Sequence, residues 1–252
     1  MSLSRRRLLL SSAAAPLALA LRVPPVLADA RDLAWVRAGV AHDGRAVLDV
    51  FGLPPEIASD VLMRASKPDA LPDGYAPSDL VSAAANGIPA AGRQVIRALI
   101  VPDTQALIGA ADEAGLSLYV GSGFRSQAYQ AAVFAVQVAR WGDDETANRY
   151  SAQPGHSHHQ LGTTIDFTTE FRAFRTSGAA TWLRDSAHRF GYVLPYTAAA
   201  ADRTGYVDEP WHGRWVGQAL AGRLQAAAYQ DWTDLTVDDV VALVRSEAAL
   251  DG

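Results

Sequence analysis

The spacing of apolar residues predicts two amphipathic helices in the middle of the chain. Residues 103–114 and 126–141 carry apolar side chains every three or four positions, the period of a helix with one buried face. Pro102 stands at the start of the first helix, and Gly115 stands where a helix C-terminus favours glycine. The buried stripe of the second helix is expected to be Ala131, Phe134, Ala135 and Val138.

Short apolar runs elsewhere predict strands that do not alternate regularly with helices. Strands are expected at residues 46–51, 116–120, 163–168, 192–194 and 213–216. Further helices are expected at residues 56–65, 179–190, 218–229 and 237–249. Because this order lacks the βαβ repeat of a parallel sheet, it favours an α+β fold with a small, mainly antiparallel sheet and helices packed around it.

The first thirty residues are predicted to be an export signal. An arginine triplet at residues 5–7 precedes an uncharged run over residues 8–21, and Arg22 and a small-residue stretch ending at Ala30 follow. This is the pattern of a secretory signal peptide. This run of 14 residues contains Pro16 and is shorter than the roughly 20 residues that cross a membrane, so no lasting span is expected. The paired arginines favour twin-arginine export, with an ordinary Sec signal as the alternative.

Cleavage near Ala30 would leave a chain in the periplasm, in the cell wall or outside the cell. Residues 31–70 are interpreted as an N-terminal extension, and residues 71–252 as the main domain, which begins with a turn-rich stretch. This mature chain has 18 basic and 26 acidic side chains, a formal charge of −8, which argues against nucleic-acid binding. Because the chain has no cysteine, disulfides and cysteine-ligated metals are excluded.

Histidines and carboxylates cluster in two segments of the main domain. Three of the six histidines lie at positions 156, 158 and 159, ahead of Asp166, and His212 follows Glu209 by three residues. A catalytic zinc ion takes three such ligands and leaves a fourth position to water. Taken alone, the cluster fits two interpretations equally. It is either a metal site or a set of histidines that are exposed or cap a turn. Gly162, which permits a sharp turn, and Pro210, which stiffens its segment, favour convergence.

Three blocks of residues carry a resemblance to a known family. They are Ser122-Gly123-Phe124-Arg125-Ser126 with Gln130 downstream, Ser157-x-His159-x-x-Gly162-x-x-x-Asp166, and Glu209-x-Trp211-His212. Together they resemble the zinc D-alanyl-D-alanine carboxypeptidases that include the VanY enzymes, a family related in fold to lysostaphin-type peptidases and the hedgehog signalling domain. The likeness runs from about Leu71 to Val244, and it implies the hedgehog/D-Ala-D-Ala-peptidase-like form of the α+β fold.

The resemblance implies a role for each matched residue. His159, Asp166 and His212 would bind one zinc ion per chain. Glu209 would take a proton from the metal-activated water and pass it to the leaving amine, and Arg125 would stabilise the scissile carbonyl or its oxyanion. The candidates for the substrate side or for support behind the site are Gln130, Ser157 and Trp211.

Two positions depart from the family pattern, and one ligand has competitors. His156 and His158 compete with His159, but the spacing to the downstream glycine and aspartate selects His159. His158 stands at a position that is often acidic in the family, and Thr164 replaces a small alanine. The threonine hydroxyl is expected to affect fine specificity more than metal binding.

The function implied is removal of the C-terminal residue from peptidoglycan stem peptides, with a D-Ala-D-Ala end as the first expectation. An L,D-carboxypeptidase or an endopeptidase would use the same site, since the loops around the pocket decide the bond. An alternative of another class is a non-catalytic cell-wall binding module that keeps its metal for structure. The presence of Glu209 argues against that alternative, because a retired enzyme would be expected to lose its general base.

Overall fold

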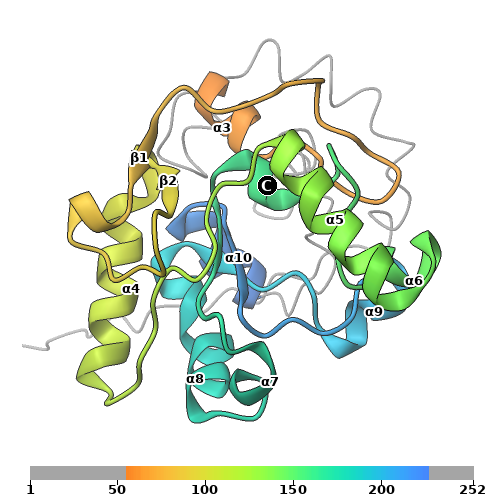
Figure 1. The fold of residues 1–252 in the computed structure, drawn as a ribbon. Helices are drawn as coiled ribbons and strands as arrows, with labels where there is room; N and C mark the ends of the chain where they lie inside the picture. Colours follow the sequence, from red (N-terminus) through yellow and green to blue (C-terminus); the bar gives the residue numbers. More distant parts are fainter. Residues whose placement is uncertain (1–54, 227–252) are drawn as a thin grey trace, which may run out of the picture.

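Two small antiparallel sheets lie among the helices of the structure, a computed structural model that describes residues 55–226 (Figure 1). The strands are β1 (Leu80–Ser82), β2 (Val95–Arg97), β3 (Thr164–Asp166), β4 (Tyr192–Val193) and β5 (His212–Trp215). Strand β1 pairs with β2, and the other three form a sheet in the order β3-β5-β4 with antiparallel pairing throughout. The predicted α+β class with a small antiparallel sheet is confirmed.

Helices cover the sheets on more than one side. They are α3 (Pro55–Val61), α4 (Val101–Glu113), α5 (Gln127–Trp141), α6 (Asp144–Asn148), α7 (Phe171–Phe174), α8 (Gly178–Ser186), α9 (Ala201–Thr204) and α10 (Gln218–Ala226). Short 3-10 helices lie between them at Ala84–Asn86, Ala98–Ile100, His158–Leu161, Ala187–Phe190 and Ala198–Ala200. Figure 1 shows α5 and α6 together on one side of the molecule, apart from α4 and from α7 and α8.

The ends of the two predicted central helices lie close to where the sequence places them. Pro102 occupies the first turn of α4, and Gly115 follows the helix with a φ of 74°, a conformation that favours glycine. At the start of α5 the Ser126 hydroxyl accepts a hydrogen bond from the Tyr129 amide at 3.2 Å. The helix ends at Gly142, whose φ is 89°.

One hydrophobic core joins the three-stranded sheet to helices from both ends of the described chain. Ile165 of β3 and Tyr192 of β4 are fully buried in it, together with Leu107 of α4 and Leu183 of α8. The core also includes residues 58, 61 and 62, so α3 packs with the domain that the sequence predicts to begin at residue 71. That boundary stays a prediction.

A charged network holds α3 against the small sheet. Arg97 of β2 contacts the carboxylate of Asp60 and donates to Asp79 at 2.8 Å. Arg97 is nearly buried, with 9% of its side chain exposed, and such a cation needs paired acceptors. The network therefore ties α3 to β2.

The predicted strand at residues 116–120 is wrong. Only Val120 forms a β-bridge, a parallel one with Ala90, and Ser122 then bridges to Asp166. Residues 120–122 thus lie between residue 90 and β3 and form one bridge to each. The neighbouring Pro89 accepts from the Val120 amide at 2.8 Å but has no N–H of its own, which prevents a longer ladder there.

The predicted buried stripe of α5 is also wrong. Ala131 and Ala135 are exposed, and Phe134 and Val138 are only partly buried. The residue of this helix that is fully buried is instead a polar one, Gln130, with 0% exposure. Helix α5 lies at the edge of the domain against α6, so its apolar spacing does not correspond to a core-facing side.

Several expectations lie outside the described residues. These are the signal peptide at 1–30, most of the extension at 31–70, the strand at 46–51 and the helix at 237–249. Within residues 55–226, none of the helices combines the length and the apolar character needed to cross a bilayer.

Gly162 closes the turn between the histidine segment and β3, and it provides a test of this packing. Its φ is 70°, and an added Cβ would lie 2.9 Å from the Arg97 Cγ. We expect Gly162→Ala to lower the free energy of unfolding by about 2–4 kcal/mol, from backbone strain and overpacking together. Gly92→Ala, at a φ of 67° with open space around it, should cost only about 1–2 kcal/mol. Urea unfolding of both variants measures the difference, and equal losses would contradict the packing argument.

Candidate active site

The pairing of two strands brings two of the predicted ligands together. Asp166 is the last residue of β3 and His212 is the first residue of β5, and the register places them directly opposite each other. His159 comes from the 3-10 helix that precedes β3, where the Ser157 hydroxyl accepts from the His159 amide at 3.3 Å. The left-handed Gly162 then turns the chain into the strand. The sequence thus builds the site from one turn and one strand pair.

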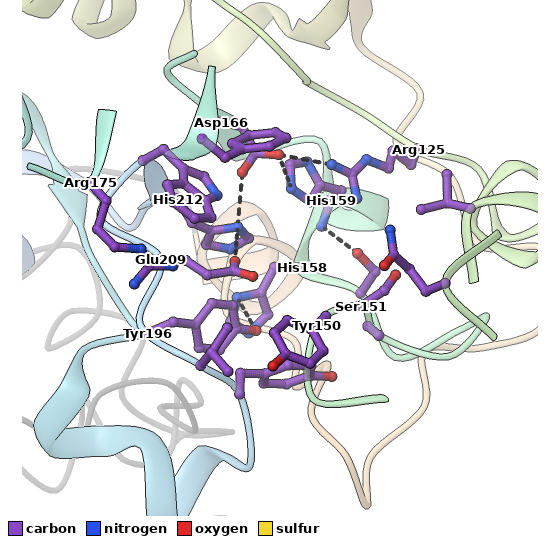
Figure 2. A pocket seen from close by; sticks show the side chains of 18 of the residues that line it. Arg125, Tyr150, Ser151, His158, His159, Asp166, Arg175, Tyr196, Glu209 and His212 are labelled. Atoms are coloured by element: carbon purple, nitrogen blue, oxygen red, sulfur yellow. Dashed lines mark hydrogen bonds and ion pairs between the residues drawn. The ribbon is translucent and has the colours of Figure 1, made fainter. Parts of the chain in front are cut away.

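The three predicted ligands form a compact, buried group. One ligand atom from each of His159, Asp166 and His212 can be chosen so that all lie within 4.8 Å of one another. The Asp166 carboxylate lies 3.3 Å from His159 Nε2 and 3.2 Å from His212 Nδ1. Figure 2 shows the three side chains pointing toward one another. Two imidazoles and a carboxylate are a ligand set that suits zinc.

A further hydrogen bond orients His159 for this role. Its Nδ1 lies 2.7 Å from the Gly123 carbonyl oxygen, which can only accept, so Nδ1 carries the proton. The other ring nitrogen, Nε2, is then left with a lone pair that faces Asp166. A backbone carbonyl behind a ligating histidine is the usual support of a metal site. The residues present therefore fit a divalent metal ion.

Burial and neighbouring charges set the protonation states of the predicted ligands. Burial, followed by the positive charge of Arg125, lowers the pKa of His159 to about 4. Burial alone would raise the pKa of Asp166, but the nearby His159, together with His212 and Arg125, brings it well below its usual range. A neutral imidazole and an ionised carboxylate are the forms that bind a metal.

Glu209 lies beside this group at the edge of a cavity. Its carboxylate is 3.6 Å from His212 Nδ1, and its backbone amide donates to the Tyr196 carbonyl at 2.8 Å. The side chain is 15% exposed, so it is mostly buried yet reachable from the cavity. Burial, followed by the negative charge of Asp166, raises the pKa of Glu209 to about 8. A divalent cation beside it would favour the ionised form.

Arg125 is held next to the predicted ligands by three neighbours. Its guanidinium donates to Asp166 Oδ2 at 2.8 Å and to the Ser122 hydroxyl at 2.9 Å. A longer bond of 3.5 Å reaches the Gln130 side-chain oxygen. The Arg125 side chain remains 18% exposed and lines the cavity, so part of its charge is open to a ligand.

The three candidates for substrate binding or support lie in different places. Ser157 and Trp211 are buried side chains that line the cavity. Gln130 lies outside the cavity lining, behind Arg125, and donates to Ser151 Oγ at 3.1 Å and to the Ala152 carbonyl at 2.7 Å. This position suits a residue that supports Arg125 from behind, which is one of the two roles that the sequence suggests for Gln130.

The cavity beside the ligands has a volume of about 470 Å³. One wall comes from the C-terminal part of α5 and from residues 150–152, and another comes from α7 and residues 207–212. In Figure 2, Arg175 lies on the side opposite Arg125 and Ser151. The predicted ligands and Glu209 thus line a cleft between two elements that are distant in the sequence.

Sequence reasoning missed a buried cluster behind the ligands. His158 stacks on Tyr196 with ring centroids 5.3 Å apart, and its Nε2 lies 3.4 Å from a guanidinium nitrogen of Arg214. Arg214 is 1% exposed and also donates to backbone carbonyls of residues 61 and 63. Burial, followed by the Arg214 charge, lowers the pKa of His158 well below its usual value. The alternation of β5, which puts residues 212 and 214 on one face, is the signal that could have identified this arginine.

Comparison with known proteins agrees with this geometry. The family model for VanY, D-alanyl-D-alanine carboxypeptidase, matches residues 93–218, a range that holds every candidate site residue. The YodJ protein of Bacillus subtilis, named as a putative carboxypeptidase, is 30% identical over 200 residues, which cover 74% of this chain and 68% of the relative. The chain belongs to the VanY family.

Solved structures show the same fold. The LdcB LD-carboxypeptidase is 29% identical with a TM-score of 0.60, and the match covers 73% of this chain and 87% of the LdcB chain. A VanY D,D-pentapeptidase in complex with Zn(II) matches with a TM-score of 0.56 at 24% identity, over 72% of this chain and 99% of its own. This VanY-family chain therefore has the fold of the D-Ala-D-Ala peptidases and belongs to a carboxypeptidase family.

The supporting position of Gln130 can be tested by its effect on stability. Gln130→Ala would leave buried partners at Ser151 and Ala152 without their donor, so we expect the free energy of unfolding to fall by about 2–3 kcal/mol. The control is Gln137→Ala on the same helix. The Gln137 side-chain oxygen accepts an exposed hydrogen bond from the Trp141 ring N–H. Its loss should lower the free energy of unfolding by about 0.5 kcal/mol or less. Denaturant unfolding compares the two. Equal effects would show that Gln130 is not a structural support.

Proposed function

We propose that this protein is a zinc-dependent D-alanyl-D-alanine carboxypeptidase that acts on peptidoglycan stem peptides. The observation that carries the proposal is the buried group of His159, Asp166 and His212, with Glu209 beside it, in the lining of one cleft. Within residues 55–226 the group offers three ligands, which would leave a coordination position for a reactant. Such an open position is typical of a catalytic metal and not of a structural one. Membership of the VanY family supports the same reading.

The bound metal would be one zinc ion per chain. His159, Asp166 and His212 would hold it, since their donor atoms face one another and the far nitrogen of His159 is fixed by the Gly123 carbonyl. A zinc ion supplies a Lewis acid that polarises a carbonyl and lowers the pKa of a coordinated water to about 7. A VanY neighbour of the same fold was solved with Zn(II), which supports the choice of metal.

Glu209 would move the proton during hydrolysis. Its carboxylate takes a proton from the attacking water as the water oxygen bonds to the scissile carbonyl carbon. It then gives that proton to the amine of the departing residue as the carbon–nitrogen bond breaks, so that Glu209 ends as it began. Its mostly buried position beside His212, with a remaining opening to the cavity, allows both transfers.

Arg125 would stabilise the negative charge that develops on the carbonyl oxygen. Its guanidinium is permanently charged and is fixed by Asp166 and Ser122, which is the preorganisation that such a role needs. Ser157 and Trp211 would contact the substrate from the cavity wall, and Gln130 would position Arg125 and residues 151–152. Covalent catalysis is not needed in this scheme.

The bond that is cleaved defines the main alternative. The likeness to the LdcB LD-carboxypeptidase favours an L,D-carboxypeptidase as the second candidate.

We also propose that residues 1–30 direct export to the compartment that holds peptidoglycan, because their charge and hydropathy pattern is that of a signal peptide.

A cleavage assay tests the reaction and the role of Glu209 together. The mature protein is incubated with a pentapeptide stem that ends in D-Ala-D-Ala and with a tetrapeptide stem that ends in a single D-Ala, and mass spectrometry identifies the products. We expect loss of one residue from the pentapeptide, stopped by a chelator. Glu209→Gln should reduce kcat by about 10²–10⁴-fold with zinc retained, whereas Glu113→Gln, an exposed change on α4, should leave kcat unaltered.

The products discriminate among the candidates. Cleavage of the tetrapeptide alone would replace the proposed bond by the L,D bond, and an internal cut would make the protein an endopeptidase. A Glu209→Gln variant with near-normal turnover would overturn the mechanism. An absence of product from either stem would favour the non-catalytic cell-wall module.

Zinc binding should also stabilise the fold. A ligand that binds only the folded state adds about 4 kcal/mol when its free concentration is a thousand times its Kd. We therefore expect calorimetry to show a higher Tm for the zinc-loaded protein than for the chelator-treated protein. His212→Ala should abolish this difference, while His188→Ala, outside the cavity lining, should preserve it. A difference that survives in His212→Ala would place the metal elsewhere.

A further inference from the structure

One wall of the cleft carries an arginine supported by two aromatic rings. The Arg140 guanidinium carbon lies 5.2 Å from the centroid of the Trp141 ring, at the end of α5. Trp141 in turn stacks on Tyr150, with centroids 4.3 Å apart and planes 10° from parallel. All three side chains line the cavity. The stack restrains the guanidinium at the cavity wall.

The opposite wall repeats this arrangement with one difference. Arg175 lies 5.1 Å from the Trp211 ring, which packs against Phe171 at 4.8 Å. Arg175, however, forms an ion pair of 2.9 Å with Asp208. Arg140 has no carboxylate within ion-pair distance among residues 55–226. Within the described part of the chain, the positive charge of Arg140 is therefore available to a ligand, whereas Arg175 is paired with Asp208.

The composition of the cleft points to an anionic ligand. The charged residues that line it are Arg125, Arg140, Arg172 and Arg175 against Asp166 and Glu209. The cleft is thus positive although the chain carries a formal charge of −5, and a bound zinc ion would add to this excess. Trp141, Tyr150 and Phe171 are also three of the five large hydrophobic side chains that the described part exposes. Exposed aromatic surface gathered at one cleft is typical of a binding site.

The length of α5 separates this arginine from the reaction centre. Arg125 stands just before the helix and Arg140 in its last turn, so about 20 Å of helix lies between their backbones at 1.5 Å per residue. The two arginine side chains shorten this gap. One extended residue of a peptide substrate spans only about 3.5 Å, so a single residue cannot bridge what remains. The terminal carboxylate of a carboxypeptidase substrate lies within one residue of the scissile bond. Arg140 is therefore placed for a group several residues away from that bond.

We propose that Arg140, restrained by the Trp141–Tyr150 stack, binds a carboxylate of the stem peptide upstream of the scissile bond. This inference rests on the proposed function and adds a specificity-determining residue to it. Two stem residues supply such a carboxylate: the γ-linked glutamate at the second position and, where present, diaminopimelate at the third. A guanidinium binds either through charge-assisted hydrogen bonds.

Selective amidation of the substrate tests the proposal and identifies the carboxylate. Three diaminopimelate-containing stem pentapeptides are compared: an unmodified one, one amidated at the third residue and one amidated at the second. For the native protein we expect kcat/KM to fall about tenfold on amidation at one of these positions, the effect of losing one charge-assisted hydrogen bond. Arg140→Gln should show the same loss on the unmodified peptide, mainly through KM, and no further loss on amidation.

Arg189→Gln is the matched control. Arg189 also packs on the ring that follows it in sequence, at 5.5 Å from Phe190, but lies outside the cavity lining. It should retain native kcat/KM and native sensitivity to amidation. Zinc content is measured in each variant, so that a loss of metal is not mistaken for a loss of substrate contact.

The outcomes separate this inference from the function on which it rests. Equal hydrolysis of all three peptides by the native protein would overturn the role of Arg140 and leave the carboxypeptidase function standing. Persistent sensitivity of Arg140→Gln to amidation would also overturn it. Failure of the native protein to hydrolyse any of the peptides would overturn both.

Discussion

The antiparallel pairing of β3 with β5 is the constraint on which the site depends. It places Asp166 opposite His212 at one end of the sheet. A slip of one residue in this register would turn one of the two side chains to the other face of the sheet. The pairing also brings Glu209, three residues before β5, to within 3.6 Å of His212. The buried core on the other face, where Gly213 fits against Phe167, holds the register in place.

The buried charged groups Asp166 and Arg214 each have partners within the fold. Asp166 receives Arg125 and both histidines of the ligand group. Arg214 is satisfied in part by backbone carbonyls at the end of α3, which ties that helix to the strand that carries His212. These contacts join the proposed metal ligands, the core and α3 into one unit. The cleft beside them collects arginines and aromatic rings in an otherwise acidic chain.

The grouping of the candidate site residues follows from the sequence more directly than the packing around them does. The ligand group and Glu209 lie in short motifs whose spacing reflects local turns, such as the left-handed Gly162. Helix ends at Gly115 and Gly142 follow from backbone chemistry in the same way. The exposed side of α5, the bridges near Val120, the arginine stacks and the buried Arg214 depend on contacts between distant segments. No local period encodes such contacts, and for this reason the apolar run at residues 116–120 wrongly predicts a strand.

X-ray absorption at the zinc edge of the purified, zinc-loaded protein tests whether His159, Asp166 and His212 form an open zinc site. We expect one zinc per chain with two imidazole nitrogens and a carboxylate oxygen at about 2.0–2.2 Å, and an additional light-atom ligand from solvent. The same spectrum of His159→Ala should lose one imidazole contribution. A spectrum with four protein ligands, or one that is unchanged in His159→Ala, would contradict an open catalytic site formed by His159, Asp166 and His212.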